Sequence, residues 1–290
     1  MKTKRSVFLS LILSAALVQG TAIINFTADE GFLEGSLDGQ QGWSVNNFPD
    51  RANVFAGGLS YSNGAVVHNG GSQSMQIISG NRVDLNDDTS EQIGEARAFI
   101  GIPTIAAGET FYFSFLHNHN AAERNFFYFA FSNGADNDNS SISAVGQNAN
   151  IDGSQQPRLR SRVRTSEGAQ SQVNGTAGIH DMGNFTTNLV VGEAFFGGDS
   201  ANSTIRLWMN PTSLNKDDNP NSFVNAGLNI GINEINTLWI RGDGGAGGNF
   251  LIDHIMIGDS WEAVVIPEPS TYAALFGLLA LGFLAWRRRR

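Results

Sequence analysis

The sequence contains no cysteine and few charged residues, and both shortages narrow the classes of protein it can encode. Without cysteine there is no disulfide framework, no Cys-ligated zinc, no iron–sulfur cluster and no thiol nucleophile. Charged residues make up 16% and hydrophobic residues 41%, which excludes an intrinsically disordered chain and a coiled coil. Basic residues number 18 against 27 acidic ones, and the resulting net charge of −9 argues against nucleic acid as a partner.

Glycine and phenylalanine, by contrast, are plentiful, at 34 and 20 positions of 290. This length is near the upper end for one domain and is sufficient for a substantial hydrophobic core. We therefore expect an acidic, globular protein.

Residues 1–22 predict a secretory signal peptide. Three basic residues within the first five positions precede an apolar stretch from Val7 to Val18, and the small residues Gly20 and Ala22 offer two cleavage points. A first transmembrane helix is the alternative, but the apolar stretch is short for crossing a bilayer.

The C-terminal end has three parts in series: a Pro-Glu-Pro motif, an apolar run and a basic cluster. The apolar run Thr271–Trp286 would extend about 24 Å as a helix, against a hydrocarbon thickness of roughly 30 Å. Basic residues that follow an apolar helix stay in the cytoplasm by the positive-inside rule. The sequence thus predicts an exported domain tethered by its C-terminus. The motif is Pro267, Glu268 and Pro269, and the cytoplasmic cluster is Arg287, Arg288, Arg289 and Arg290.

These three parts, in this order over residues 267–290, resemble the PEP-CTERM sorting signal of Gram-negative bacteria. The resemblance implies that an exosortase, a transpeptidase-like membrane enzyme, recognises the Pro-Glu-Pro motif and removes the tail. It also implies an association with bacteria that make exopolysaccharide and biofilm matrix. A plain membrane anchor is the alternative.

Residues 23–266 read as one all-β domain, because short β-prone runs alternate with Gly, Asn, Asp and Ser clusters and no long helical periodicity appears. Alternating phenylalanines in Phe111–His117 would line one face of a strand, and Phe126–Phe131 is apolar on both faces, as in a central strand. The predicted strands are Ile23–Phe26, Ala65–His68, Ser74–Ile78, Ala96–Ile100, Phe111–His117, Phe126–Ser132, Leu159–Arg164, Asn188–Val191, Thr204–Asn210, Thr237–Arg241 and Phe250–Ile257.

Several of these runs together resemble the concanavalin A-like, laminin-G-like jelly rolls that PEP-CTERM proteins often carry. The marks are Leu207-Trp208 followed by Asn210-Pro211, and a last strand from Phe250 that leads to Trp261. The resemblance implies an antiparallel jelly-roll β-sandwich over 23–266, with a signal helix before it and a transmembrane helix after it.

Removing the two signals makes the domain more acidic. Residues 23–266 retain 11 basic and 26 acidic residues, a formal net charge of −15. Such a domain attracts cations rather than anionic polymers over most of its surface.

One basic stripe departs from this balance. The arginines at 158–164 alternate with Leu159, Ser161 and Val163, so a strand would place all the guanidinium groups on one face. Such a stripe could hold an acidic polysaccharide through bidentate contacts. The alternative is that Asp and Glu on neighbouring strands neutralise it. The candidate anionic-glycan residues are Arg158, Arg160, Arg162 and Arg164.

Other chemistry is sparse. A glycoside hydrolase of this fold would need carboxylates two apart on one strand, and only Asp136 and Asp138, in a predicted loop, come near that pattern. His117 and His119 could ligate a metal, although a polar strand end explains them as well. The acidic loops 84–88 and 216–219 could bind calcium, or simply form turns. We assign no catalytic or metal residue and no cofactor, with calcium as the one candidate ion.

The sequence therefore predicts a non-catalytic exported protein, sorted by an exosortase to the cell surface or extracellular matrix. An exopolysaccharide-associated or biofilm-associated structural or adhesive role follows from the resemblance. The alternative is a carbohydrate-binding module that uses the arginine stripe or exposed aromatic platforms at Trp43, Trp208 or Trp239. The expected partners are the exosortase, the membrane through the C-terminal helix, and an extracellular polysaccharide.

Overall fold

The computed structural model describes residues 22–24, 26–46, 52–68, 71–78, 80–85, 94–120, 126–134, 140–147, 158–177, 179–182, 186–244 and 249–265. Most of the predicted signal peptide, the whole predicted helix at 271–286 and the arginine cluster after it lie outside these residues. In the described part of the chain, no helix is long and apolar enough to cross a membrane.

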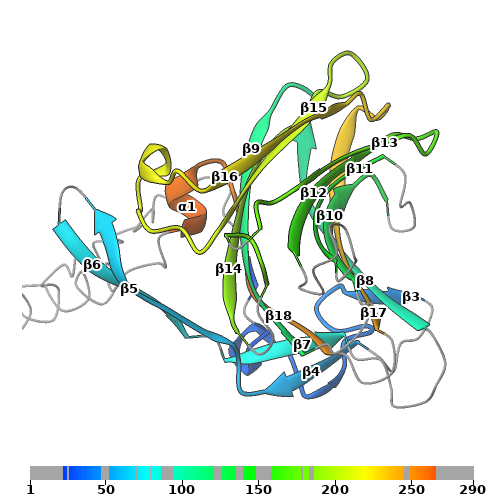
Figure 1. Cartoon of the computed structure of the whole chain (residues 1–290). Coiled ribbons are helices and arrows are strands. Elements are labelled where there is room, and N and C mark those ends of the chain that lie inside the picture. The colour runs from blue at the N-terminus through cyan, green and yellow to red at the C-terminus, as the bar shows by residue number, and fades with distance from the viewer. Residues whose placement is uncertain are drawn as a thin grey trace, which may run out of the picture.

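The described residues form two antiparallel β-sheets packed face to face, as predicted (Figure 1). One is a nine-stranded sheet in the order β16-β15-β14-β9-β18-β7-β4-β2, with β1 also paired to β18. Its strands are β1 (Ala22–Ile24), β2 (Gly35–Ser36), β4 (Ala52–Ala56), β7 (Asn81–Leu85), β9 (Thr110–Asn120), β14 (Asn188–Phe195), β15 (Ser203–Met209), β16 (Ser222–Leu228) and β18 (Asn249–Gly258).

The second is a seven-stranded sheet in the order β13-β12-β11-β10-β17-β8-β3. Its strands are β3 (Ser44–Asn46), β8 (Gly94–Ala106), β10 (Phe126–Ser132), β11 (Ser141–Gln147), β12 (Arg158–Arg164), β13 (Gln170–Asn174) and β17 (Glu234–Gly244). The predicted central strand, β10, is the middle strand of this sheet, and its bounds match the prediction.

Phenylalanines from the two sheets fill the space between them. In β9 the alternating residues Phe111, Phe113 and Phe115 point inwards, and they meet alternate phenylalanines of β10. The rings of Phe115 and Phe129 stack with centroids 4.2 Å apart. Burying each such side chain stabilises the fold by roughly 1.5–3 kcal/mol, so this layer contributes much of the folding free energy.

The outer face of the nine-stranded sheet is covered by a second apolar cluster. A short helix, α1 (Trp261–Val265), packs there, and a two-stranded ribbon of β5 (Ser60–His68) and β6 (Gly71–Ile78) projects beside it (Figure 1). The buried residues of this cluster are Leu59, Tyr61, Met75, Ile77, Leu116, Leu189, Val191, Trp208, Leu214, Met256, Trp261, Val264 and Val265.

The prediction of exposed aromatic platforms at Trp43, Trp208 and Trp239 is wrong. Their exposed fractions are 1%, 1% and 4%, so none offers an open ring to a sugar. Trp43 belongs to the main core, and Trp208 lies under α1, where its ring centroid is 4.9 Å from that of Trp261. The physical reason is that a large ring on a sheet face is buried when another element packs over that face.

Candidate anionic-ligand surface

Strand β12 places its arginines on the outer face of the seven-stranded sheet. Leu159 and Val163 are fully buried in the core between the sheets. Because alternate side chains of a strand point to opposite faces, the arginines at 158–164 share the face that is turned away from the core. The sequence pattern therefore predicted the geometry of this stripe correctly.

The strand register adds two arginines that the sequence analysis did not include. Arg241 of β17 lies opposite both Tyr128 of β10 and Arg97 of β8. A continuous row of residues consequently crosses all seven strands, at right angles to the stripe. In strand order it consists of Asn174, Arg160, Val145, Tyr128, Arg241, Arg97 and Asn46.

Tyr128 is the aromatic centre of this surface. The guanidinium carbon of Arg162 lies 4.3 Å from the centroid of its ring, and that of Arg241 lies 5.3 Å from it. The ring of Trp239 is 5.9 Å from that of Tyr128 and packs in a small apolar cluster with Phe99. Cation–π contacts of this kind hold planar guanidinium groups flat against a ring.

The arginines differ in their charge partners. Arg158 donates from Nε to the carboxylate of Asp181 at 3.0 Å, so that guanidinium is compensated. Asp181 comes from the segment after β13, not from a neighbouring strand of the sheet. Arg160 donates from Nη1 to the neutral amide oxygen of Gln172 at 2.8 Å.

The surface is recessed. Arg158 and Arg162 are 7% and 4% exposed, whereas Arg160 and Arg164 are half-buried. Burial lowers the pKa of Arg160, while nearby Tyr128 raises it and Arg162 lowers it further. An arginine still carries its charge at neutral pH, because its ordinary pKa lies so far above 7. Partly desolvated guanidinium groups make stronger hydrogen bonds to anions than fully solvated ones do.

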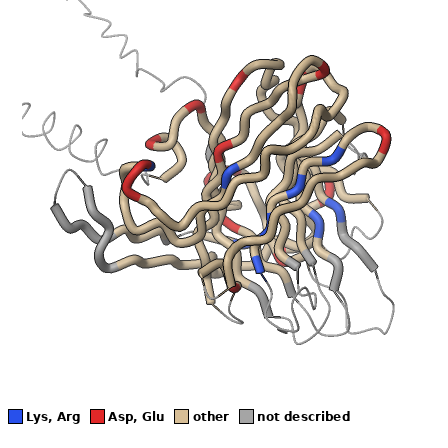
Figure 2. Tube along the Cα trace, turned by 45° about the horizontal axis from the view of Figure 1, so that its top comes forward, with Lys and Arg blue, Asp and Glu red and all other residues tan. Residues whose placement is uncertain are grey.

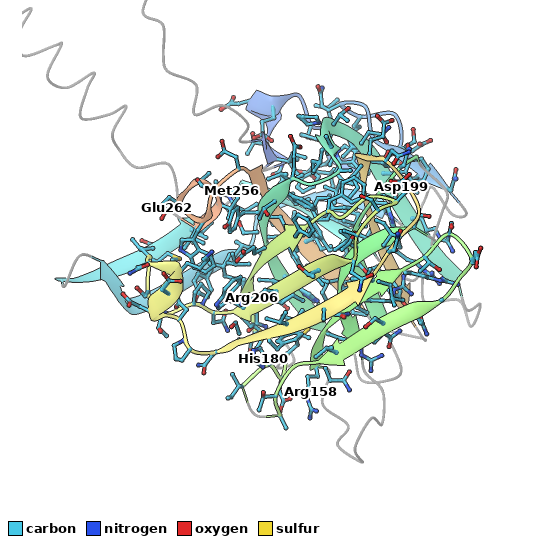
Figure 3. The ribbon with its side chains drawn as sticks, turned by 90° about the horizontal axis from the view of Figure 1, so that it is seen from above. Arg158, His180, Asp199, Arg206, Met256 and Glu262 are labelled. Carbon is cyan, nitrogen blue, oxygen red and sulfur yellow. The ribbon has the colours of Figure 1, made fainter. Side chains whose placement is uncertain are left out.

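Figure 2 shows several blue segments of Lys and Arg close together towards the right of the molecule, whereas many red segments of Asp and Glu lie in loops. Figure 3 places Arg158 next to His180, away from Glu262 at α1. The carbonyl of His180 accepts from the backbone N–H of Leu159 at 3.0 Å, which fixes the Arg158 end of the stripe. Arg206, on the nine-stranded sheet, is exposed and lies outside the basic surface.

The predicted metal ligands do not assemble into a site within the described residues, which contain no group of three His, Asp or Glu side chains placed to hold an ion. His117 is 1% exposed, and its ring packs 4.1 Å from that of Phe127. Asp217 and Asp218 belong to a short 3-10 helix, η3 (Lys216–Asp218), where Asn215 donates to the Asp218 carboxylate at 3.0 Å. The carboxyl pair at 136 and 138, and Asp87 and Asp88 of the acidic loop, lie outside the described residues.

Comparison with solved structures finds lectin domains. The chain is 11% identical to the lectin UEA-II in complex with galactose, covering 82% of this chain and 97% of that one with a TM-score of 0.46. It is 9% identical to the Ca2+/Man-bound exoplasmic/lumenal domain of VIP36, covering 83% of this chain and 90% of that one with a TM-score of 0.46. It is also 9% identical to an alginate lyase from Alteromonas sp. 272, covering 57% of this chain and 77% of that one with a TM-score of 0.34. These identities and scores transfer no ligand or activity to this chain.

No curated protein sequence matches the chain. A family model for the PEP-CTERM protein-sorting motif matches residues 265–290. The predicted sorting signal is therefore confirmed, and with it the combination of such a signal with an all-β sandwich. Residues 265–290 are a PEP-CTERM protein-sorting motif, which implies export and exosortase-mediated sorting to the surface.

Proposed function

We propose that this protein is a non-catalytic component of the cell surface or extracellular matrix that binds an acidic polysaccharide through its seven-stranded sheet. In this proposal residues 1–22 direct export, 23–266 form the binding domain, and 267–290 direct sorting through Pro267, Glu268, Pro269 and the terminal arginines. The observation that carries the binding role is the crossing of the β12 arginine stripe with the row through Tyr128 and Arg241.

The chemistry of this surface suits a polymer with regularly spaced carboxylates or sulfates. Alternate residues of a strand lie about 7 Å apart, so the arginines of β12 repeat at about that distance. Neighbouring strands lie about 4.8 Å apart, so Arg160 and Arg241, which are three strands apart, are separated by about 14 Å. A guanidinium group binds a carboxylate through two parallel hydrogen bonds, and the Tyr128 ring positions the guanidinium groups of Arg162 and Arg241. Donors and rings arranged in this way serve binding rather than hydrolysis.

The net charge of −15 for residues 23–266 makes this surface selective. Acidic side chains elsewhere repel an anionic polymer, so we expect contact to be confined to the basic surface. Ionic contacts of this kind weaken as salt shortens the screening length from about 10 Å at 0.1 M to about 3 Å at 1 M.

The test is a binding measurement on the exported protein, with a polyuronate and with neutral dextran of similar length. We expect the polyuronate to bind and the dextran not to bind. The double variant Arg160→Gln/Arg164→Gln should lower polyuronate affinity at least about tenfold, since charge-assisted hydrogen bonds contribute roughly 1.5–3 kcal/mol each. Both of these side chains are half-buried, whereas Arg162 is only 4% exposed.

The matched control is Arg206→Gln, because Arg206 is likewise an arginine in a strand, over the ring of Trp208 at 5.7 Å, but on the other sheet. This variant should bind like the wild type. Equal losses in the control and the double variant would contradict the assignment of the surface. Shortening of the polyuronate during incubation, measured by size-exclusion chromatography, would contradict the non-catalytic part of the proposal.

A further inference from the structure

The folded domain ends almost at the sorting motif. The last described residue, Val265, belongs to α1 and is 1% exposed, and only Ile266 separates it from Pro267. An extended chain spans at most about 3.3–3.6 Å per residue, so Glu268 stays within about 11 Å of the buried Val265. No spacer separates the sandwich from the segment that a sorting enzyme must reach.

Three contacts hold α1 on the nine-stranded sheet. The indole nitrogen of Trp261 donates to the carbonyl of Leu214 at 2.8 Å, and the Trp261 ring meets that of Trp208 edge to face. The hydroxyl of Ser114, in β9, donates to the carbonyl of Val264 at 2.6 Å. A helix of five residues is not stable alone in water, so α1 exists because of this packing and would unfold on leaving it.

The domain is also wide compared with its tether. A domain of this size has a radius of gyration of about 18 Å, which corresponds to a sphere about 46 Å across. The start of the apolar run at Thr271, in contrast, lies within about 22 Å of Val265 along the contour. A binding site that takes a peptide as an extended strand contacts several consecutive residues, through main-chain hydrogen bonds and pockets for alternate side chains. Residues 261–265 are helical and packed against the sheet, so they cannot supply the upstream part of such a segment.

We propose that α1 controls access to the sorting motif, and that its release from the nine-stranded sheet precedes cleavage by the membrane enzyme. This inference rests on the exosortase sorting in the proposed function. Release converts 261–265 into extended chain and adds about 17 Å of reach, which moves the wide domain away from the enzyme. The rate of cleavage then follows the fraction of molecules in which α1 is open.

The test measures loss of the C-terminal tail from the full chain by pulse-chase in cells that contain the sorting enzyme. Ser114→Ala and Trp261→Phe each remove one hydrogen bond that holds α1. Each should speed cleavage about threefold to tenfold, the change in open population expected for one hydrogen bond. An eight-residue Gly-Ser insertion between Ile266 and Pro267 should speed cleavage at least as much. Ser114→Ala should add nothing further once this spacer is present.

The matched control is Ser161→Ala, which removes a buried hydroxyl that donates to the carbonyl of Val173 at 3.3 Å in the other sheet. It should leave the cleavage rate unchanged. Equal rates for the wild-type and spacer chains would overturn the inference, as would acceleration by Ser161→Ala equal to that by Ser114→Ala. If no chain loses its tail, including the spacer chain, the sorting proposal itself fails, and the role of α1 fails with it.

Discussion

Asp84→Asn should change the pH dependence of stability in a direction that burial dictates. Asp84 lies in β7 between Val83 and Leu85, which point into the core, so its carboxyl group is on the outer face of the nine-stranded sheet. It is only 5% exposed there. Burial raises its pKa from 3.8 to about 6, although the charge of Arg82 acts in the opposite direction.

The direction of this pH effect follows from the linkage between proton binding and folding. A carboxyl group whose pKa is higher in the folded state binds its proton more tightly there, so ionisation destabilises the fold. The difference of about two pKa units corresponds to about 3 kcal/mol, nearly all of it present at pH 7 and mostly relieved by pH 4. Asparagine keeps the shape of the side chain and carries no charge. The free energy of unfolding of Asp84→Asn relative to wild type should therefore be higher at pH 7 than at pH 4 by about 2–3 kcal/mol.

Urea denaturation of both proteins between pH 4 and pH 7.5 measures this difference. Asp29→Asn is the control for the removal of a carboxylate, because Asp29 is exposed. A flat difference for Asp84→Asn would refute the argument. A fall in the free energy of unfolding of Asp84→Asn relative to wild type as the pH rises would refute it as well. That result would mean that partners in the folded state stabilise the ionised Asp84 carboxylate.

Three further predictions follow from the core and the tail. Phe129→Ala should lower the free energy of unfolding by about 3–5 kcal/mol, since Phe129 is fully buried and stacked on Phe115. Phe55→Ala, at a side chain that is 40% exposed, should lower it much less in the same denaturation assay. Gly192→Ala should lower the melting temperature, because its new methyl group would overlap the Phe113 ring directly opposite. Gly101→Ala is the matched control, because Gly101 also lies in a strand and its new methyl group would meet no atom within 4 Å. Glu268→Ala should make full-length protein build up in the inner membrane, and mass spectrometry of wild-type extracellular protein should find no residues 270–290; an intact terminus at Arg290 would mean that the segment is only an anchor.

Side-chain periodicity made part of the binding surface predictable. A strand has a period of two residues, so the spacing of Arg158, Arg160, Arg162 and Arg164 was enough to place them on one face. The same reasoning identified the inward phenylalanines of β9 and the central position of β10. Local sequence is sufficient in these cases because each depends only on residues within one strand.

Other parts of the surface depend on strand register. Arg97, Tyr128 and Arg241 come from three strands that are distant in sequence, and strand pairing alone brings them into one row with Arg160. Asp181 likewise reaches Arg158 from a segment 23 positions further along the chain. No spacing within the sequence encodes such neighbours, since they arise from long-range hydrogen bonding between strands.

The amino-acid sequence was therefore sufficient to predict the all-β class, most of the longer strands, the arginine stripe and the C-terminal sorting motif. Each of these follows from local alternation or from a contiguous run of residues. The burial of the aromatic rings, the pairing of Arg158 with Asp181 and the helix at 261–265 became apparent only in the folded structure. Burial and pairing depend on which element packs over a given face, and that is a property of the whole fold rather than of any segment.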